Sequence, residues 1–171
     1  MKITTKDLSL MAILLAILIV CSKISFPIGL ISVTLQTFAV AILSYILGVK
    51  RSLITISTYI IIGLIGIPVF STGGGFSYIL TPSFGFIIGF IPFSIILIKI
   101  KNFIISLSSL ILLYLIGAVY MVLILTLYLG RDVTFIYVLE VAVIPFIIKD
   151  IISIILAKFI YTRIKDNQYI K

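Results

Sequence analysis

Apolar residues run in long, nearly uncharged stretches along the chain, and short groups of Gly, Pro, Ser and charged residues separate them. A helix needs about 20 apolar residues to cross a bilayer. Helices are expected because an open sheet leaves its backbone groups unsatisfied in lipid. The pattern predicts six membrane-spanning helices, at approximately residues 7–25, 32–49, 52–68, 82–99, 104–129 and 136–162.

Short polar groups mark several of the predicted helix ends. Gly48–Arg51 indicates a turn between the second and third helices. Thr81 followed by Pro82 is typical of a helix start, with an N-cap and a proline in the first turn. The segments near 26–31, 69–80 and 130–135 are expected to be loops on one side of the membrane.

Composition supports the same class of protein. Hydrophobic residues make up 63% of the chain and charged residues 11%, whereas a soluble domain carries about 25% charged residues. We therefore expect an all-α integral membrane protein, with residues 1–171 forming one transmembrane domain.

The basic residues predict the orientation of this domain. A net charge of +8 raises the question of nucleic-acid binding, but the cations are scattered at segment ends rather than clustered, so no nucleic-acid partner is expected. Lys23 and Arg131 fall on one side of the predicted spans and ten cations on the other, which by the positive-inside rule places both termini in the cytoplasm. The ten are Lys2, Lys6, Lys50, Arg51, Lys99, Lys101, Lys158, Arg163, Lys165 and Lys171.

The residue types make an enzyme or a metal site improbable. The sequence has no His, and its five acidic residues are widely separated. A Ser nucleophile would lack its usual base, and no P-loop for ATP is present. The single cysteine, Cys21, excludes an intramolecular disulfide and is expected to be a small packing residue. We expect no catalytic residues, no metal and no cofactor.

Asp150 is the most informative residue, because it lies with Lys149 deep in the last apolar segment. A carboxylate at bilayer depth costs about 2.5–3.5 kcal/mol even on insertion scales, and such residues usually face the protein interior or a cavity. One interpretation is a structural ion pair with Lys149. The other is a polar ligand site, and Pro145 is expected to kink the helix beside it.

Two further features favour a ligand site near the outer surface. Gly73, Gly74 and Gly75 free the loop backbone to approach a ligand and present N–H groups, with Phe70, Phe76 and Tyr78 as apolar cover; a plain flexible connector is the alternative. Gln36 lies near the outer end of the second predicted helix, where its amide must find a partner. That partner is either a polar ligand or another helix.

Two pairs of small residues at a spacing of four indicate close helix contacts. Ala12 and Ala16 lie on the first predicted helix, and Gly85 and Gly89 on the fourth. Each pair alone is a weak signal, and for the glycines we expect packing within the molecule.

Taken together, these stretches resemble the BioY family, the biotin-specific substrate-binding S components of energy-coupling factor (ECF) vitamin transporters. The resemblance extends from about Ala12 to Lys158 and is carried by VTLQTFAVAIL, YIIIGLIGIPVFSTGGGFSYILTPSFGFIIGF, YLIGAVYM and IPFIIKDIISIILAKF.

The resemblance implies six transmembrane helices in the bacterial cytoplasmic membrane, with the ligand near the outer surface under a long loop. It implies biotin as ligand, and a membrane coupling subunit with two ATPase subunits as partners. Ala12 and Ala16 match the family's small-residue motif that docks on the coupling subunit, which favours partner contact for this pair.

The chain departs from the family pattern at several positions. Phe84 replaces a family Gly, and Phe86 keeps the aromatic ring but lacks the family's Tyr hydroxyl. Lys149 stands where the family tends to have Gly, and Ser153 where it has Lys. Asp150 therefore carries over directly, whereas the Lys role does not.

The resemblance implies a role for each candidate residue in binding biotin. Asp150 would accept hydrogen bonds from the ureido N–H groups, and Gln36 would donate to the ureido oxygen. Tyr78 and Phe86, with Phe70 and Phe76, would supply apolar walls or the lid. Gly73, Gly74 and Gly75, with Lys149, would receive the carboxylate; a placement with Lys149 and Asp150 both at the ureido end stays open.

Three alternatives remain beside the biotin hypothesis. The first is an S component for thiamin or riboflavin, with the same fold and a different pocket. The second is a small stand-alone carrier or channel in which Asp150 binds a proton. The third, a membrane enzyme, lacks paired acids or a nucleophile with its base.

Overall fold

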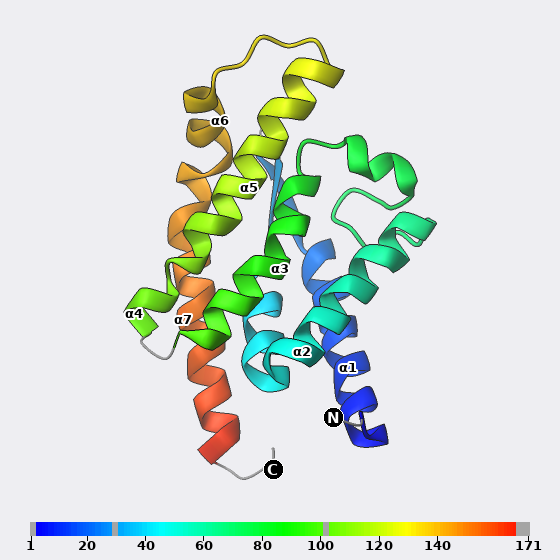
Figure 1. The fold of residues 1–171 in the computed structure, drawn as a ribbon, viewed down its shortest axis with the longest axis vertical. Coiled ribbons are helices and arrows are strands. Elements are labelled where there is room, and N and C mark those ends of the chain that lie inside the picture. Colours follow the sequence, from blue (N-terminus) through cyan, green and yellow to red (C-terminus); the bar gives the residue numbers. More distant parts are fainter. Residues whose placement is uncertain (1–2, 29–30, 101–102, 167–171) are drawn as a thin grey trace.

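The computed structural model describes residues 3–28, 31–100 and 103–166, and it consists mainly of helices that run along one long axis (Figure 1). In chain order the elements are α1 (Thr5–Lys23), β1 (Ser25–Ile28), β2 (Ile31–Thr34), α2 (Gln36–Ile65), the 3₁₀ turn η1 (Phe76–Leu80), α3 (Phe84–Lys99), α4 (Phe103–Ser106), α5 (Ser109–Leu123), the π-helical turn η2 (Ile124–Tyr128), α6 (Phe135–Ala142) and α7 (Ile144–Asp166).

Helices occupy each of the six predicted ranges, so the helical class is confirmed. Of the described residues, three segments are long and apolar enough to cross a membrane, namely Thr5–Lys23, Gln36–Ile65 and Ser109–Tyr128, and Phe84–Lys99 is a shorter apolar helix. Large apolar side chains such as Ile61, Ile111 and Ile148 lie exposed on the outside of the bundle. A surface of this kind suits lipid rather than water, and the chain is a multi-pass membrane protein.

The predicted start of the second helix is wrong. Residues 25–28 and 31–34 form an antiparallel hairpin, in which Ser25 pairs with Thr34 and Phe26 with Val33. The helix begins only at Gln36. Val33 and Thr34 are β-branched, which favours an extended backbone.

The predicted turn after the second helix is a sharp bend inside α2. Gly48 there has φ 71°, a left-handed conformation that glycine adopts without steric cost. The third predicted helix ends at Ile65 rather than at residue 68, because Gly66 caps it in a left-handed conformation.

The last predicted span is broken into α6 and α7 at Val143. Pro145 is the second residue of α7 and has no N–H to continue the hydrogen-bond ladder of α6. The prediction of a kink at Pro145 is therefore confirmed. After the break, α7 begins at Ile144, about 1.7 turns before Asp150.

Close packing of α3 against α5 positions the middle of the bundle. A Cβ atom on Gly85 would lie 2.3 Å from the Tyr120 side chain, and one on Gly89 would lie 2.8 Å from Leu113. From the other helix, Gly117 leaves space for the ring of Phe86. The interpretation of Gly85 and Gly89 as internal packing residues is confirmed.

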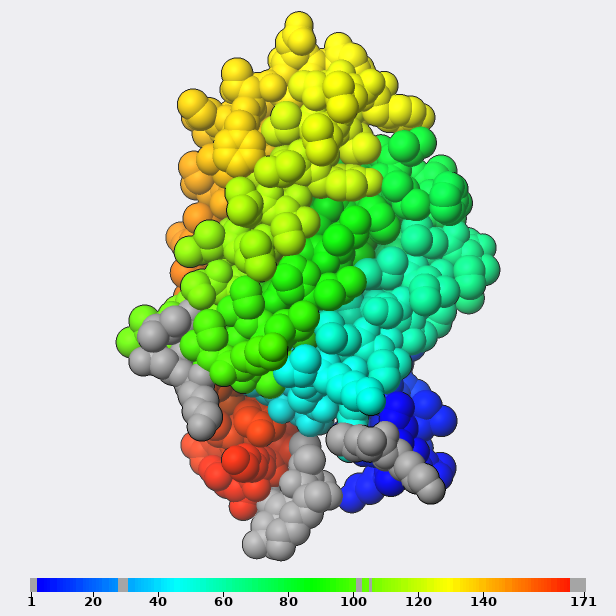
Figure 2. Space-filling view, in the orientation of Figure 1, coloured from blue at the N-terminus to red at the C-terminus, as the bar shows by residue number. Residues whose placement is uncertain are grey.

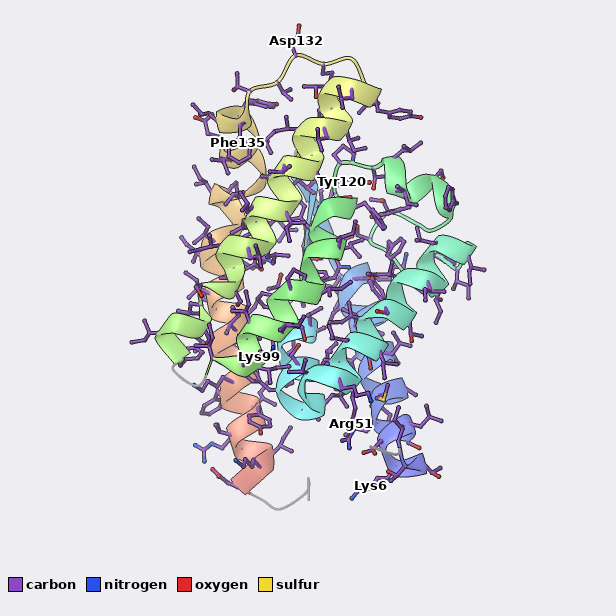
Figure 3. The ribbon with its side chains drawn as sticks, viewed as in Figure 1. Lys6, Arg51, Lys99, Tyr120, Asp132 and Phe135 are labelled. Atoms are coloured by element: carbon purple, nitrogen blue, oxygen red, sulfur yellow. The ribbon has the colours of Figure 1, made fainter. Side chains whose placement is uncertain are left out.

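The two ends of the molecule differ in charge. The start of α1 and the end of α7 lie at one end (Figure 1). Lys6 and Arg51 are found at this end, and Lys99 lies nearer to it than the Asp132 loop does (Figure 3). Arg51 forms an ion pair with Asp7 there, with 3.0 Å between Nη1 and Oδ1. In the space-filling view the loop around residue 130 forms the opposite end (Figure 2). Lys2, Lys101 and Lys171 lie outside the described residues.

Candidate functional site

A pocket opens among the hairpin, the start of α2, the 71–83 segment, α3, α5 and the α6–α7 break. Its polar lining includes a carboxylate, an ammonium, an amide and several hydroxyl groups, and its remaining walls are mostly aromatic and aliphatic. Small-molecule sites are commonly apolar with a few convergent polar groups. The polar side chains are Ser32, Thr34, Gln36, Thr37, Ser71, Tyr78, Ser83, Tyr114, Lys149 and Asp150, and the apolar ones include Phe86, Ile87, Phe90, Leu113 and Phe146.

Asp150 is the buried charge of this pocket, with 3% of its surface exposed. The Tyr114 hydroxyl donates to its Oδ2 over 2.7 Å. Its Oδ1 is paired with the ammonium of Lys149. Oδ2 is therefore hydrogen-bonded, whereas Oδ1 has the ion pair but accepts no hydrogen bond from the described residues. The carboxylate is thus compensated by one counter-charge and one hydrogen bond.

Lys149 connects α7 to the hairpin. Besides its ion pair with Asp150, its Nζ donates to the carbonyl oxygen of Thr34 over 2.9 Å. The two side chains are adjacent in sequence, and both still reach the pocket. The structural ion pair and the ligand-site interpretation therefore describe the same two groups.

Gln36 lies in the pocket wall and is also hydrogen-bonded within the protein. Its Nε2 donates to the Tyr59 hydroxyl over 2.7 Å, and its Oε1 accepts from the Thr34 hydroxyl over 2.9 Å. The bond to Tyr59 joins the two arms of α2 on either side of Gly48, which correspond to the second and third predicted helices, so the interhelical hydrogen bond considered from the sequence is present. An amide nitrogen carries two N–H groups and the oxygen two lone pairs, so the side chain retains capacity for a ligand.

Tyr78 is the aromatic residue of the loop that reaches the pocket. It is buried, its hydroxyl lies 3.3 Å from those of Ser71 and Thr72, and its ring packs on Phe70. Phe70 is fully buried behind it, against Tyr59 and in the space that Gly63 leaves. Phe76 points away, with 76% of its surface exposed, so it is not part of the pocket wall.

The three consecutive glycines are outside the pocket lining. The N–H of Gly73 donates to Phe70 and that of Gly75 to Gly63, so both are already used by backbone carbonyls. A Cβ atom on Gly74 would lie 2.3 Å from the Ile67 oxygen, which explains glycine there by close backbone packing. In this conformation the run shapes the loop rather than the pocket surface.

The last turn of α1 fastens this loop to the bundle. Ser22 donates to the carbonyl of Val69, and Lys23 donates to that of Phe70 over 2.6 Å. Tyr59 also donates to Val69 over 3.2 Å. Three side chains from two helices therefore hold the backbone that precedes Ser71 and Tyr78.

Ala12 and Ala16 lie on the exposed face of α1, away from the interior. Met11, Leu14 and Leu18 form the buried face of the same helix. The pair is thus free of internal packing and available to another protein. Cys21 is buried, as expected of a packing residue.

Tyr114 is a pocket residue that the pattern of the sequence does not single out. A tyrosine in an apolar helix has a polar tip that usually needs a partner when buried, and this signal was present in the YLIGAVYM stretch. The nearest partner depends on how α5 and α7 pack, which the pattern of residues does not specify. Within the described residues, no group of three or more His, Cys, Asp or Glu side chains is placed to hold a metal.

Comparison with known proteins identifies the family. Residues 1–168 match the model of the BioY family. The chain is 35% identical to "Probable biotin transporter BioY" of Pyrococcus horikoshii over 167 residues, which cover 95% of this chain and 98% of that protein. It is 31% identical to "Biotin transporter BioY" of Thermotoga maritima over 159 residues, covering 88% and 90%.

A solved structure shares the fold. It is the S-component for biotin from an ECF-type ABC transporter, with a TM-score of 0.80 and 22% sequence identity over 97% of this chain and 96% of that one. Matches of this extent, from a family model, from relatives in two organisms and from a fold, agree with one another. The chain belongs to the BioY family, whose members are transporter components and not enzymes.

Proposed function

We propose that this protein binds biotin and is the substrate-specific S component of an ATP-driven ECF transporter. The observation that carries the proposal is the pocket around Asp150, where a buried carboxylate and an ammonium lie side by side among aromatic walls. The names of the relatives support biotin as the ligand.

The ureido ring of biotin matches this pair of charges. Each edge of a cyclic urea presents an N–H donor next to the carbonyl acceptor. Asp150 accepts the N–H and Lys149 donates to the carbonyl oxygen on the same edge, since charge-assisted hydrogen bonds are the strong ones. Gln36 offers the ureido oxygen a further amide donor.

The remaining parts of biotin are assigned to the rest of the pocket. The apolar thiophane ring lies against Phe86, Tyr78 and Phe146, which line the walls. The valerate carboxylate extends toward the hydroxyl groups of Ser71 and Ser83, at the two ends of the 71–83 segment that covers the pocket. We assign the carboxylate to these hydroxyls instead of to the N–H groups of Gly73 and Gly75, because both N–H groups already donate to backbone carbonyls.

The orientation in the membrane follows from the charges. Lys6 and Arg51 lie at the end that carries both termini, and we assign this end to the cytoplasm by the positive-inside rule. The pocket cover then faces outward. Ala12 and Ala16 are the proposed contact with the coupling subunit, which two ATPase subunits drive.

The test is calorimetric titration of the purified protein with biotin, with thiamin and riboflavin titrated in parallel. Tight binding of biotin alone, weakened by roughly a hundredfold or more but still measurable in Asp150→Ala, is the expected result. Glu140→Ala is the matched control, because Glu140 is an exposed acid outside the pocket lining. Absence of biotin binding by the folded wild-type protein, or binding of thiamin or riboflavin instead, contradicts the proposal.

A further inference from the structure

We propose that Tyr114 is a positioning residue for ligand recognition, which acts by fixing the orientation of the Asp150 carboxylate. The inference rests on the proposed function and adds a residue to it. Tyr114 comes from α5 and Asp150 from α7, and both line the pocket. Their hydrogen bond therefore joins two walls of the site.

The Asp150 carboxylate needs such a contact because of where it lies. A terminal carboxyl torsion is broad and not held by the side chain itself. Lys149, whose ammonium also donates to the Thr34 carbonyl, contacts only Oδ1 of the carboxylate and leaves Oδ2 unheld. The Tyr114 hydroxyl holds Oδ2 at 2.7 Å, which fixes the plane of the carboxylate. Oδ1, which accepts no hydrogen bond within the described residues, then presents its lone pairs in a constant direction.

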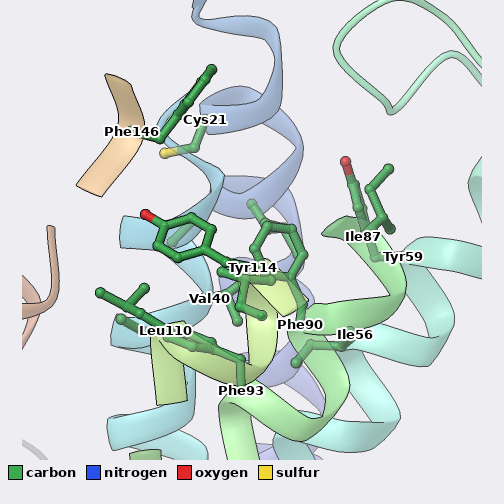
Figure 4. Close-up of a cluster of buried hydrophobic side chains, with 14 of the residues drawn as sticks. Cys21, Val40, Ile56, Tyr59, Ile87, Phe90, Phe93, Leu110, Tyr114 and Phe146 are labelled. Carbon is green, nitrogen blue, oxygen red and sulfur yellow. The ribbon is translucent and has the colours of Figure 1, made fainter. Parts of the chain in front are cut away.

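Tyr114 is itself held rigidly. It is buried among apolar side chains that include Phe90 and Phe146 (Figure 4). The helix that carries it is pressed against α3, where Gly89 contacts Leu113 one residue away. The hydroxyl of a buried tyrosine is carried on a rigid ring with few rotatable bonds. It therefore holds the carboxylate in one orientation better than the ammonium of a lysine does.

The contact between Tyr114 and Asp150 has a direct consequence for ligand affinity. A ligand N–H that meets a correctly turned carboxylate gains a short charge-assisted hydrogen bond. A carboxylate free to turn has to give up that freedom on binding, which lowers affinity. Tyr114 thus contributes to biotin affinity without touching biotin.

The test is the variant Tyr114→Phe, which removes only the hydroxyl oxygen. We expect its dissociation constant for biotin to rise by roughly tenfold, the scale of one lost hydrogen bond to a charged group. Tyr45→Phe is the matched control, because Tyr45 is a half-buried tyrosine outside the pocket lining that stacks on Tyr161. It should bind biotin within twofold of the wild type.

A double-mutant cycle separates positioning from a direct contact with biotin. If Tyr114 acts through the carboxylate, Tyr114→Phe changes affinity by less than twofold once Asp150→Ala is present. Unchanged affinity in Tyr114→Phe alone, or an undiminished loss in the Asp150→Ala background, overturns the inference. Wild-type protein that fails to bind biotin at all contradicts the proposed function instead, so the two failures are distinguishable.

Discussion

At the scale of single residues, the pocket depends on one compensated charge. Asp150 is almost fully buried, and Lys149 keeps 23% of its side chain exposed. Removing one member of a buried ion pair leaves the other uncompensated, which is costly, whereas removing both is often tolerated. This asymmetry gives a prediction that does not depend on the identity of the ligand.

Lys149→Met is expected to lower the free energy of unfolding by roughly 1–3 kcal/mol, less than for a fully buried pair because the lysine is partly exposed. Thermal unfolding in detergent measures the change. Adding Asp150→Asn should recover most of the lost stability without restoring biotin binding. Lys165→Met, an exposed lysine near the end of the same helix, is the matched control. A single variant as stable as wild type would show that Lys149 does not compensate Asp150.

The sequence allowed Asp150 to be identified by one physical argument, the cost of a carboxylate inside a span. Gln36 was identified by the same reasoning about polar groups, and the structure brings both into one pocket. Tyr114 was missed because tyrosines are frequent in this chain and only tertiary packing selects this one. Three consecutive glycines, residues 73–75, suggested a ligand-binding loop. In the structure, Gly74 instead allows close packing of the loop backbone.

At the scale of elements, the helices were predictable and the hairpin was not. Long apolar runs and Gly or Pro breaks determine where helices lie, as at Gly48 and Pro145. Each strand of the hairpin is only four residues long, and the hairpin lies between two long apolar segments. No clear strand pattern is therefore visible at residues 25–28. Their pairing with residues 31–34 depends on tertiary packing.

Gly85→Val tests whether the contact of α3 with α5 positions the pocket. The added side chain meets Tyr120 at a separation that no real Cβ contact adopts, so the helices must move apart. We expect a loss of roughly 1–3 kcal/mol in stability, the usual cost of overpacking, and weaker biotin binding. Val119→Leu adds volume on the exposed face of α5 and should change neither quantity. Equal stability of Gly85→Val and wild type in thermal unfolding would argue against tight packing here.

At the scale of the whole molecule, the pocket and the proposed docking surface are formed by different residues. The pocket lies toward the end of the molecule away from the termini, whereas Ala12 and Ala16 lie on the exposed face of α1. A side-chain substitution at Ala12 or Ala16, without movement of α1, should therefore leave the pocket intact.

Ala12→Leu combined with Ala16→Leu should keep calorimetric biotin binding within about twofold, because neither residue contacts the interior. Uptake of radiolabelled biotin by cells with the coupling and ATPase subunits should fall at least tenfold, since bulky residues keep a partner helix from close approach. Val119→Phe, at an exposed position on α5, should preserve uptake. Normal uptake by the double variant would assign docking to another face.

The last turn of α1 has a mechanical consequence. Ser22 and Lys23 hold the carbonyls of Val69 and Phe70 in the loop that leads to the pocket cover. Six residues of helix, about 9 Å, separate Ala16 from Ser22. A rigid displacement of α1 therefore either carries the loop with it or breaks both hydrogen bonds. In each case, movement of the helix that carries Ala16 changes the position or the anchoring of the segment that leads to Ser71 and Tyr78 in the pocket wall.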